Sequence, residues 1–338
     1  MVSISRRAAL SAAAGIAVAL SAPAFAQSVP VRVGVIPVLG ASQLFVVDKE
    51  KLAPSLDFKF TTFESGPVMI QALASGSLDV YVAGVAPLGV ARSKGIDVRV
   101  VTATAVEEMT VAAGAKLAPY FAAGVKPADA FKKFKADTGK AARIATQPPG
   151  SVPHTTLAHW LSVATATDKA DVEVVPMGID ATQQALLAGA VDGATIREPT
   201  DTIVTGRDPR IKIVALGGEM FPDQPGTVVA VAGAFLAKNP AAVQALVDAV
   251  VKATDIVQKD PKRAAPAIEA ALGKGIVDTA TIEKALASPA SKFVADPRTI
   301  MTATAKMQTY QVSIGTLDKD VPLDGLFDPS FFLKATGK

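Results

Sequence analysis

The sequence predicts an α/β protein built from two similar lobes, and three observations support this prediction. The pattern QALxxGxxD occurs twice, beginning at Gln71 and again at Gln184. Apolar runs of strand length alternate with helical segments in both halves of the chain, which is typical of largely parallel sheets with right-handed crossovers. The chain has 338 residues, half of them hydrophobic, so it is long enough to bury two substantial cores.

Each copy of QALxxGxxD predicts a helix that turns back into a buried strand. Gly76 and Gly189 stand where the helix should end, and glycine adopts the left-handed conformation that such an end requires. Asp79 and Asp192 then open the next strand, whose carboxyl end leads into a loop with a proline. Two lobes with this design would face each other across a cleft that can hold a ligand.

The first half begins the βα alternation. Its expected strands, in chain order, are 31–36, 57–63, 78–82 and 98–101. Between them we expect helices over 44–47, with Ser42 as a plausible N-cap, over the first QAL copy, and over a short segment that ends at Lys94-Gly95.

The second half repeats the alternation. Its expected strands are 142–146, 172–175, 193–196 and 211–216, with one helix through Leu157 and Trp160 and another over the second QAL copy. Two further extended segments, 109–113 and 227–232, are interpreted as the two crossing strands of a hinge. The predicted lobes are therefore 28–108 with 227–338, and 109–226.

The first 26 residues predict an export signal that is removed from the mature protein. Ser5-Arg6-Arg7 is followed by an apolar stretch, 8–20, and Ala24-Phe25-Ala26 has the small-x-small form of a cleavage site. The paired arginines favour the twin-arginine route, and the general secretory route stays open. Either route predicts a periplasmic protein cleaved near Ala26.

Composition excludes several function classes. The chain has no cysteine, which removes thiol catalysis, thiolate metal sites and a lipoprotein anchor. Without residues 1–26 it carries 32 basic and 31 acidic residues, and this balance argues against a nucleic-acid partner. No nucleophile elbow, P-loop or metal-spaced histidines occur, so we expect neither an enzyme nor a cofactor or metal.

The candidate ligand-binding residues lie where strands end and helices begin. Ligands of α/β proteins bind at the carboxyl ends of strands, where free backbone N–H groups and helix dipoles favour polar acceptors. The candidates are Ser42, Gln43, Gly66, Gly84, Pro87, Gly150, Ser151, His154, Arg197 and Glu198.

Several candidates also have a purely structural interpretation. Ser42 and Gln43 either contact the ligand or only cap a helix, and Gly84 and Pro87 either line the pocket or only shape a turn. His154 either binds an anion or lies exposed at a helix start.

The order and spacing of several segments resemble a known family. The opening strand with its GASQ loop, "ESGPVMIQALASGSLDVYVAGVAP", "RIATQPPGS" and "QQALLAGAVDGATIREPTD" are similar to the exported solute-binding proteins of ABC importers that serve nitrate, taurine, alkanesulfonates and thiamine-pyrimidine precursors. The resemblance covers residues 30–335. It implies the type II periplasmic-binding-protein fold, a small-molecule ligand, hinge closure, and delivery to an inner-membrane permease with its cytoplasmic ATPase by a monomer.

Arg197 is where the sequence departs from that family, which usually has an aromatic residue before Glu-Pro. An arginine in the cleft suits a sulfonate, carboxylate or nitrate. It equally suits an ion pair with Glu198 or Asp201. Glu198 itself is either an acceptor for an amine or a hydrogen-bond anchor on the hinge side.

The function that the sequence favours is capture of a small anionic solute, sulfonate first, for import. Two alternatives stay open: a thiamine-pyrimidine precursor binding or biosynthesis protein on the same fold, and a sensor-type binding protein. The biosynthetic enzyme is the poorer alternative, because its cysteine-rich iron-binding motif needs residues that this chain does not have.

Overall fold

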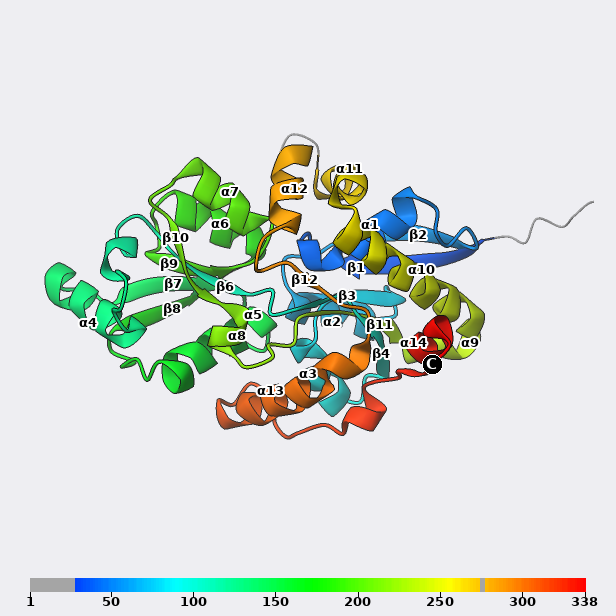
Figure 1. Cartoon of the computed structure of the whole chain (residues 1–338). Coiled ribbons are helices and arrows are strands. Elements are labelled where there is room, and N and C mark those ends of the chain that lie inside the picture. The colour runs from blue at the N-terminus through cyan, green and yellow to red at the C-terminus, as the bar shows by residue number, and fades with distance from the viewer. Residues whose placement is uncertain (1–27, 274–276) are drawn as a thin grey trace, which may run out of the picture.

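Two five-stranded sheets form the framework of the protein in the computed structural model, which describes residues 28–273 and 277–338 (Figure 1). The predicted export signal lies outside the described residues. The first sheet has the order β2 (Leu56–Thr62), β1 (Val29–Val35), β3 (Val80–Gly84), β11 (Thr227–Ala232) and β4 (Val98–Ala103). The second has the order β10 (Lys212–Leu216), β6 (Thr110–Ala113), β9 (Gly193–Ile196), β7 (Ala142–Thr146) and β8 (Val172–Pro176).

Four of the five strands in each sheet run in one direction, and this confirms the expected α/β class. β1 is parallel to β2 and β3, whereas β11 is antiparallel to both of its neighbours, β3 and β4. In the second sheet β7 is parallel to β8 and β9, and β6 is antiparallel to β9 and β10. In each sheet the reversed strand is the one that arrives from the other lobe.

The segments 109–113 and 227–232, interpreted as the two crossing strands of a hinge, lie just beyond the crossings themselves. They are β6 and β11, and each lies inside a sheet because it is apolar enough to be buried on both faces. The chain crosses between the sheets through shorter segments, 104–109 and 221–226. These segments are bonded to each other: Glu107 N donates to Gln224 O at 2.8 Å, and Met109 N donates to Gln224 Oε1 at 3.1 Å.

A small two-stranded sheet reinforces the first crossing. Its strands are β5 (Ala105–Val106) and β12 (Lys292–Phe293), which pair antiparallel. The lobe limits of 28–108 with 227–338 and 109–226 stay a prediction.

Helices cover both faces of the first sheet, and its strand residues alternate between two cores as their period of two requires. Val33, Val80 and Val229 face one cluster, whereas Tyr81 and Val228 face the other. The helices of this half are α1 (Ser42–Lys49), α2 (Gly66–Ala74), α3 (Ala86–Ser93), α9 (Gly233–Lys238), α10 (Pro240–Lys259), α11 (Pro261–Leu272), α12 (Thr279–Leu286), α13 (Met301–Ser313) and α14 (Ser330–Thr336).

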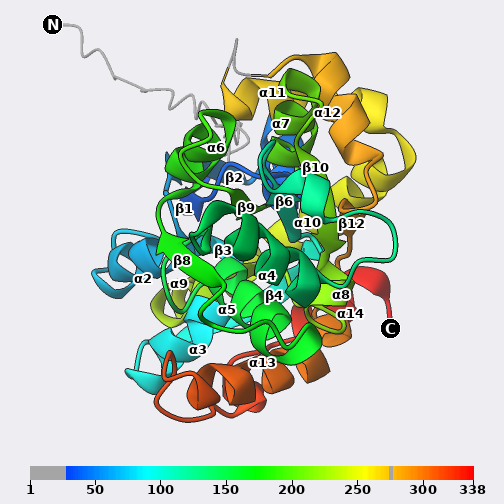
Figure 2. The same cartoon turned by 90° about the vertical axis from the view of Figure 1, so that its left-hand side faces the viewer.

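The second sheet is covered in the same way. Helices lie on both of its faces (Figure 2). Ala112 and Ala194 pack with Leu186 and Val204 in one cluster, and Val111 and Ile144 pack in the cluster that contains Trp160. The helices of this half are α4 (Pro127–Thr138), α5 (Val152–His159), α6 (Ile179–Leu187), α7 (Thr200–Arg207) and α8 (Gly217–Met220), and a π-helical turn, Trp160–Ala164, extends α5. Short 3-10 turns occur at Leu39–Ala41, Ala118–Tyr120, Pro297–Ile300 and Leu323–Gly325.

The two QAL copies form α2 and α6, as predicted. Gly76 and Gly189 follow these helices with φ of +72° and +66°, a conformation that favours glycine. The predicted apolar face of the helix after Pro240 is also confirmed, since Val243, Val247 and Val250 of α10 are fully buried. Among the described residues, no helix combines the length and apolar character that a membrane crossing needs.

Candidate functional site

Loops at the carboxyl ends of strands from both sheets meet between the lobes. The amide of Leu39, after β1, donates to the carbonyl of Glu198, after β9, at 3.0 Å. Gly84 ends β3, and a Cβ placed on it would lie 2.6 Å from Cγ2 of Val152 in the other lobe. The structure therefore brings the loops before α1, α3, α5 and α7 to one place, as the sequence predicted for the strand ends (Figure 1).

Gly66 and Pro87 form part of the first-lobe wall at this place. A Cβ on Gly66 would lie 2.7 Å from the Tyr81 hydroxyl oxygen and 2.9 Å from Cγ of Pro87. The Tyr81 hydroxyl donates to the Gly84 carbonyl at 2.8 Å, and burial raises the pKa of this phenol above its usual value. Tyr81 is therefore a neutral donor that fixes the end of β3.

Ser42 and Gln43 are fully buried in the first turn of α1. Ser42 is the first helical residue and its hydroxyl caps nothing, because the N-cap position is Ala41 and no side chain bonds there. The capping interpretation was therefore wrong. Ser42 Oγ has no partner among the described residues, and Gln43 donates through Nε2 to the Thr104 carbonyl at 2.8 Å, which leaves its Oε1 without a donor.

The second lobe contributes the turn before α5. Ser151 is the N-cap of this helix and its hydroxyl accepts from the amide of His154 at 3.3 Å, so it has the structural role of a cap. Gly150 has φ of +82° and its carbonyl accepts from Gln311 of α13 at 3.5 Å. His154 is partly buried, and this burial lowers the pKa of its imidazole, which favours the neutral ring.

Arg197 forms a buried ion pair with a residue that the sequence analysis did not single out. Its Nη1 lies 3.0 Å from Oε1 of Glu108, and the two side chains are 3% and 5% exposed. The same carboxylate oxygen accepts from the Thr227 hydroxyl at 2.7 Å. The pair joins the loop after β9 to the first crossing segment and to Thr227 at the start of β11. The alternative of an ion pair with Glu198 or Asp201 is not observed.

The ion pair lies directly beside the loop after β1. A Cβ placed on Gly40 would collide with Oε2 of Glu108 and with Thr227, so only glycine fits this position. Oε2 of Glu108 and Nε of Arg197 have no partner among the described residues. Each member of the pair thus keeps one unused hydrogen-bonding atom at the junction of the lobes.

Glu198 has a structural role through its backbone and its side chain. Its carboxylate accepts from Thr202 N at 3.1 Å and from the Thr202 hydroxyl at 3.0 Å, and the peptide bond to Pro199 is cis. Burial raises the pKa of the Glu198 carboxyl, whereas hydrogen bonds from Ser288 and Thr202 oppose this rise. The carboxylate therefore points to the α7 and α12 side, which favours the anchor interpretation.

Asp201 is a second acid that sequence reasoning did not place in the site. Its Oδ1 accepts from the Thr110 hydroxyl at 2.8 Å, and its Oδ2 has no partner among the described residues. Burial, followed by repulsion from Glu198, raises its pKa well above the usual value. The sequence contains no clear signal for these two acids, since Glu108 follows Glu107 and Asp201 stands in the polar run Arg197-Glu198-Pro199-Thr200.

A cavity of about 10 Å³ lies beside Arg197, between Met109, Gln147, Ile179 and Thr195. Its size is about that needed by one water molecule. No group of three or more His, Cys, Asp or Glu side chains suited to a metal ion occurs in residues 28–273 and 277–338. The described part of the site is therefore a polar contact between lobes.

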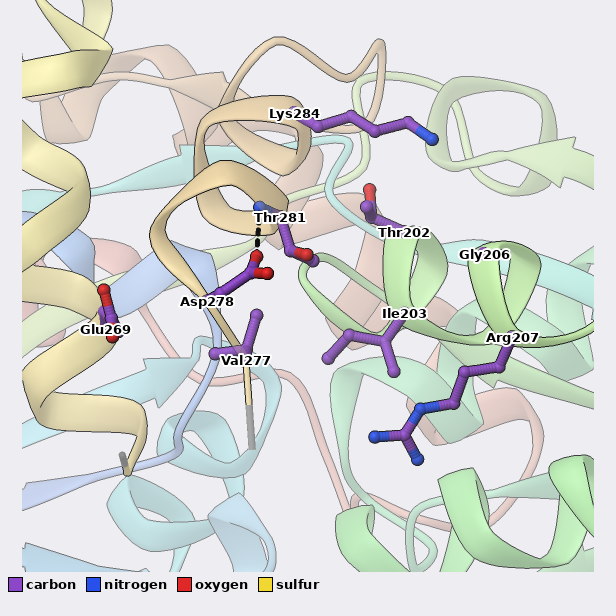
Figure 3. A pocket seen from close by; sticks show the side chains of 9 residues that line it. All are labelled: Thr202, Ile203, Gly206, Arg207, Glu269, Val277, Asp278, Thr281 and Lys284. Carbon is purple, nitrogen blue, oxygen red and sulfur yellow. Dashed lines mark hydrogen bonds between the residues drawn. The ribbon is translucent and has the colours of Figure 1, made fainter. Parts of the chain in front are cut away.

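A larger pocket of about 540 Å³ opens on the other side of the Glu198 loop (Figure 3). It lies between α7 and the α11–α12 segment, and its wall includes Thr202, whose hydroxyl bonds Glu198. Figure 3 shows charges of both signs around it, with Arg207 and Lys284 on the rim. None of the predicted site residues lines this pocket.

Sequence comparisons place the chain among binding proteins. It is 25% identical to a putative binding protein of Brucella abortus over 249 residues, which covers 72% of each chain. It is also 28% identical over 144 residues to the nitrate import ATP-binding protein NrtC of Synechococcus elongatus, a match that covers 43% of this chain and only 22% of NrtC.

Solved structures share the fold. The periplasmic nitrate-binding protein NrtA of Synechocystis PCC 6803 superposes with a TM-score of 0.77 at 13% identity, covering 92% of this chain and 89% of NrtA. The alkanesulfonate-binding protein SsuA of Xanthomonas axonopodis pv. citri gives 0.71 at 19% identity, covering 90% and 100%. The two-lobed fold is thus that of periplasmic binding proteins. Because the model of the NMT1-like family matches residues 25–272, well over half of the chain, this protein belongs to the NMT1-like family.

Proposed function

We propose that this protein is the exported solute-binding component of an ABC import system, which captures a small polar solute between its lobes by hinge closure. The observation that carries the proposal is the polar junction of the lobes. Ser42, Glu108 and Arg197 are almost fully buried there and each keeps a hydrogen-bonding atom without a partner. Buried polar atoms without partners are rare in folded proteins, so such a group favours a site for a polar ligand.

The contacts between the lobes suit a closing motion. Besides the Leu39–Glu198 bond, Ile179 N at the start of α6 donates to the Glu64 carbonyl at 3.2 Å, and Tyr310 of α13 shares a hydrogen bond with Ser162 at 2.8 Å. These contacts join separate secondary-structure elements and continue neither sheet. The cavity beside Arg197 is smaller than any organic solute, so the lobes have to part before one can enter. Two short crossings permit such a rotation.

The proposed partners and location follow from the relatives. NrtA is a periplasmic nitrate-binding protein and NrtC is an import ATP-binding protein, and we propose a comparable assembly of permease and ATPase for this chain. The predicted export signal supports a periplasmic location. We propose a monomeric, non-catalytic protein, which is supported by its similarity to binding proteins.

The site limits the range of candidate solutes more than the relatives do. Nitrate and alkanesulfonates are the ligands in the names of NrtA and SsuA. The sequence-based preference for an anion depended on a free Arg197, whereas its guanidinium pairs with Glu108. Nitrate and sulfonates therefore belong in a ligand screen, but the paired Arg197 does not favour them over other solutes.

The proposal is tested with the mature protein in a thermal-shift screen of nitrate, sulfonates, amines, amides and pyrimidines, followed by calorimetry. A solute at 100 times its Kd should stabilise the folded protein by about 2.7 kcal/mol. If no class of small solute shifts the melting temperature, the proposed function is wrong.

Closure is tested separately with Gly84→Val. The added side chain would overlap Val152, which is a short and stiff residue, and so hold the lobes apart. We expect solute affinity to fall at least about tenfold, equivalent to 1.4 kcal/mol, with the fold retained. Gly206→Val is the matched control, since nothing lies within 4 Å of a Cβ there. Equal affinity of the Gly84→Val and control variants would contradict closure at this contact.

A further inference from the structure

The unused polar atoms at the lobe junction differ in kind, and this difference bears on the solute. They belong to residues that are at least nine-tenths buried, namely Ser42, Gln43, Ser65, Glu108, Arg197 and Asp201. The hydroxyls can donate or accept. Gln43 Oε1, Glu108 Oε2 and Asp201 Oδ2 are oxygens of amide and carboxyl groups, whereas Arg197 Nε is the one atom of the set that can only donate.

The orientation of the Gln43 amide is fixed by its partner. Its nitrogen lies 2.8 Å from the Thr104 carbonyl, which can only accept, so Oε1 is the free end. Acceptors therefore outnumber fixed donors at the junction, and a solute rich in N–H groups would satisfy them.

The buried charges at the junction also favour a solute that donates hydrogen bonds. Arg197 is the one buried Lys or Arg side chain in residues 28–273 and 277–338, whereas Glu108, Glu198 and Asp201 are buried acids near it. The charge of Arg197 is already compensated by Glu108 at 3.0 Å. A further anion would add an uncompensated negative charge to a site shielded from water, which is costly.

We infer that the solute is a small organic cation, an amine that donates N–H bonds to Glu108, Asp201 and Gln43 and offers one oxygen to Arg197 Nε. This inference rests on the proposed binding function and names the substrate class of the same site. Burial raises the pKa of Asp201, and a cation bound beside it would oppose this rise by favouring the ionised carboxylate.

The test compares four probes by thermal shift and calorimetry on the mature wild-type protein. Ethanolamine has the amine and the oxygen, choline has the same arm without N–H donors, and ethanesulfonate and nitrate are anions. We expect ethanolamine to raise the melting temperature and to bind at least about tenfold more tightly than the other three. Binding of ethanesulfonate or nitrate in preference to ethanolamine would overturn the inference and leave the binding function intact. If neither ethanolamine nor a panel of other primary amines raises the melting temperature, the inference is also wrong. The proposed function fails only if no solute of the wider screen raises the melting temperature either.

A charge variant identifies the recognising residue. Glu108→Gln keeps the shape of the side chain and releases Arg197 from its counter-charge. We expect ethanolamine affinity to fall at least about tenfold and binding of ethanesulfonate or nitrate to appear. Glu173→Gln is the control, because its side chain is 59% exposed on the far edge of the second sheet. Unchanged ethanolamine affinity in folded Glu108→Gln would reject the inference, and Asp201→Asn replaces it in this test if Glu108→Gln does not fold.

Discussion

The two copies of QALxxGxxD form the same connection between neighbouring strands in both lobes, which we call the joint: an aspartate at the start of one strand bonded to the backbone of an arginine in the next. The loops that follow the two copies differ in charge. In the first lobe the Asp79 carboxylate accepts from the Arg32 amide at 2.9 Å, and Asp79 N donates to the Arg32 carbonyl at 2.9 Å. In the second lobe Asp192 does the same with Arg143, at 2.9 Å and 2.8 Å. Each aspartate thereby ties its strand, β3 or β9, to the parallel neighbour, β1 or β7 (Figure 1).

Beyond this joint the two lobes diverge. The first copy leads into Gly84 and Pro87, which contribute backbone shape and no charge. The second leads into Arg197, Glu198 and Asp201, all of them buried. The repeated residues are those that hold strands together, and the residues that differ are those at the lobe junction. The comparison therefore separates the residues that build the scaffold from those that we propose to recognise a solute.

The largest expected effect comes from breaking the buried ion pair that Arg197, in the loop after β9, forms with Glu108. Arg197→Met leaves Glu108 buried without its cation, so the free energy of unfolding should fall by about 3–5 kcal/mol, measured by urea denaturation. The matched change in the first lobe, Arg32→Met, breaks a pair whose arginine is 49% exposed and should cost about 1 kcal/mol or less.

A double variant checks the reason for this difference. Arg197→Met combined with Glu108→Gln removes both charges and should recover most of the lost stability, because no uncompensated charge stays buried. If Arg197→Met costs no more than Arg32→Met, the pair is not isolated from water as described.

The second effect is on the pH dependence of stability. Burial and the neighbouring Glu198 raise the pKa of Asp201, so the folded protein binds a proton more readily than the unfolded chain, whose aspartates titrate near about 4. The contribution of Asp201 to the free energy of unfolding should therefore be largest below about pH 4. It should fall as the pH rises toward and through the raised pKa of Asp201. Asp201→Asn keeps the oxygen that Thr110 bonds and should flatten this fall, measured by thermal melts from pH 4 to 8.

The control for Asp201 is an acid of the other lobe. Asp255→Asn changes a side chain that is 64% exposed and should leave the pH profile as it is in the wild type. A profile of Asp201→Asn that coincides with the wild type would mean that another group, such as Glu198, causes the dependence.

The strands and helices that build the two lobes could be predicted from the sequence, whereas the contacts at the lobe junction could be predicted only in part. Periodicity and the repeated Gly and Asp predicted the sheets, because these features act locally or between neighbouring strands. The pairing of Arg197 with Glu108 spans two sequence segments 89 residues apart and depends on how the lobes meet. Local propensity contains no information on such a contact, so Glu108 was not among the partners considered for Arg197. The exact extent of the two crossings was not predicted for a related reason, since an apolar segment has the same sequence pattern inside a sheet and between two sheets.

The smallest effect tests whether the two joints are energetically equal. Gly76 and Gly189 have φ of +72° and +66°, and a Cβ on either would meet nothing within 4 Å. Alanine at either position would therefore add only the cost of the left-handed conformation, about 1–2 kcal/mol, with no clash. We expect Gly76→Ala and Gly189→Ala to lower the free energy of unfolding by the same amount, within about 0.5 kcal/mol.

Gly206→Ala, in the last turn of α7 and without a left-handed φ, should instead stabilise the protein by up to about 1 kcal/mol, because alanine favours a helix and restricts the unfolded chain. Unequal costs at Gly76 and Gly189 would show that the lobes do not share one joint, since the local geometry of the two turns is the same and only their surroundings differ.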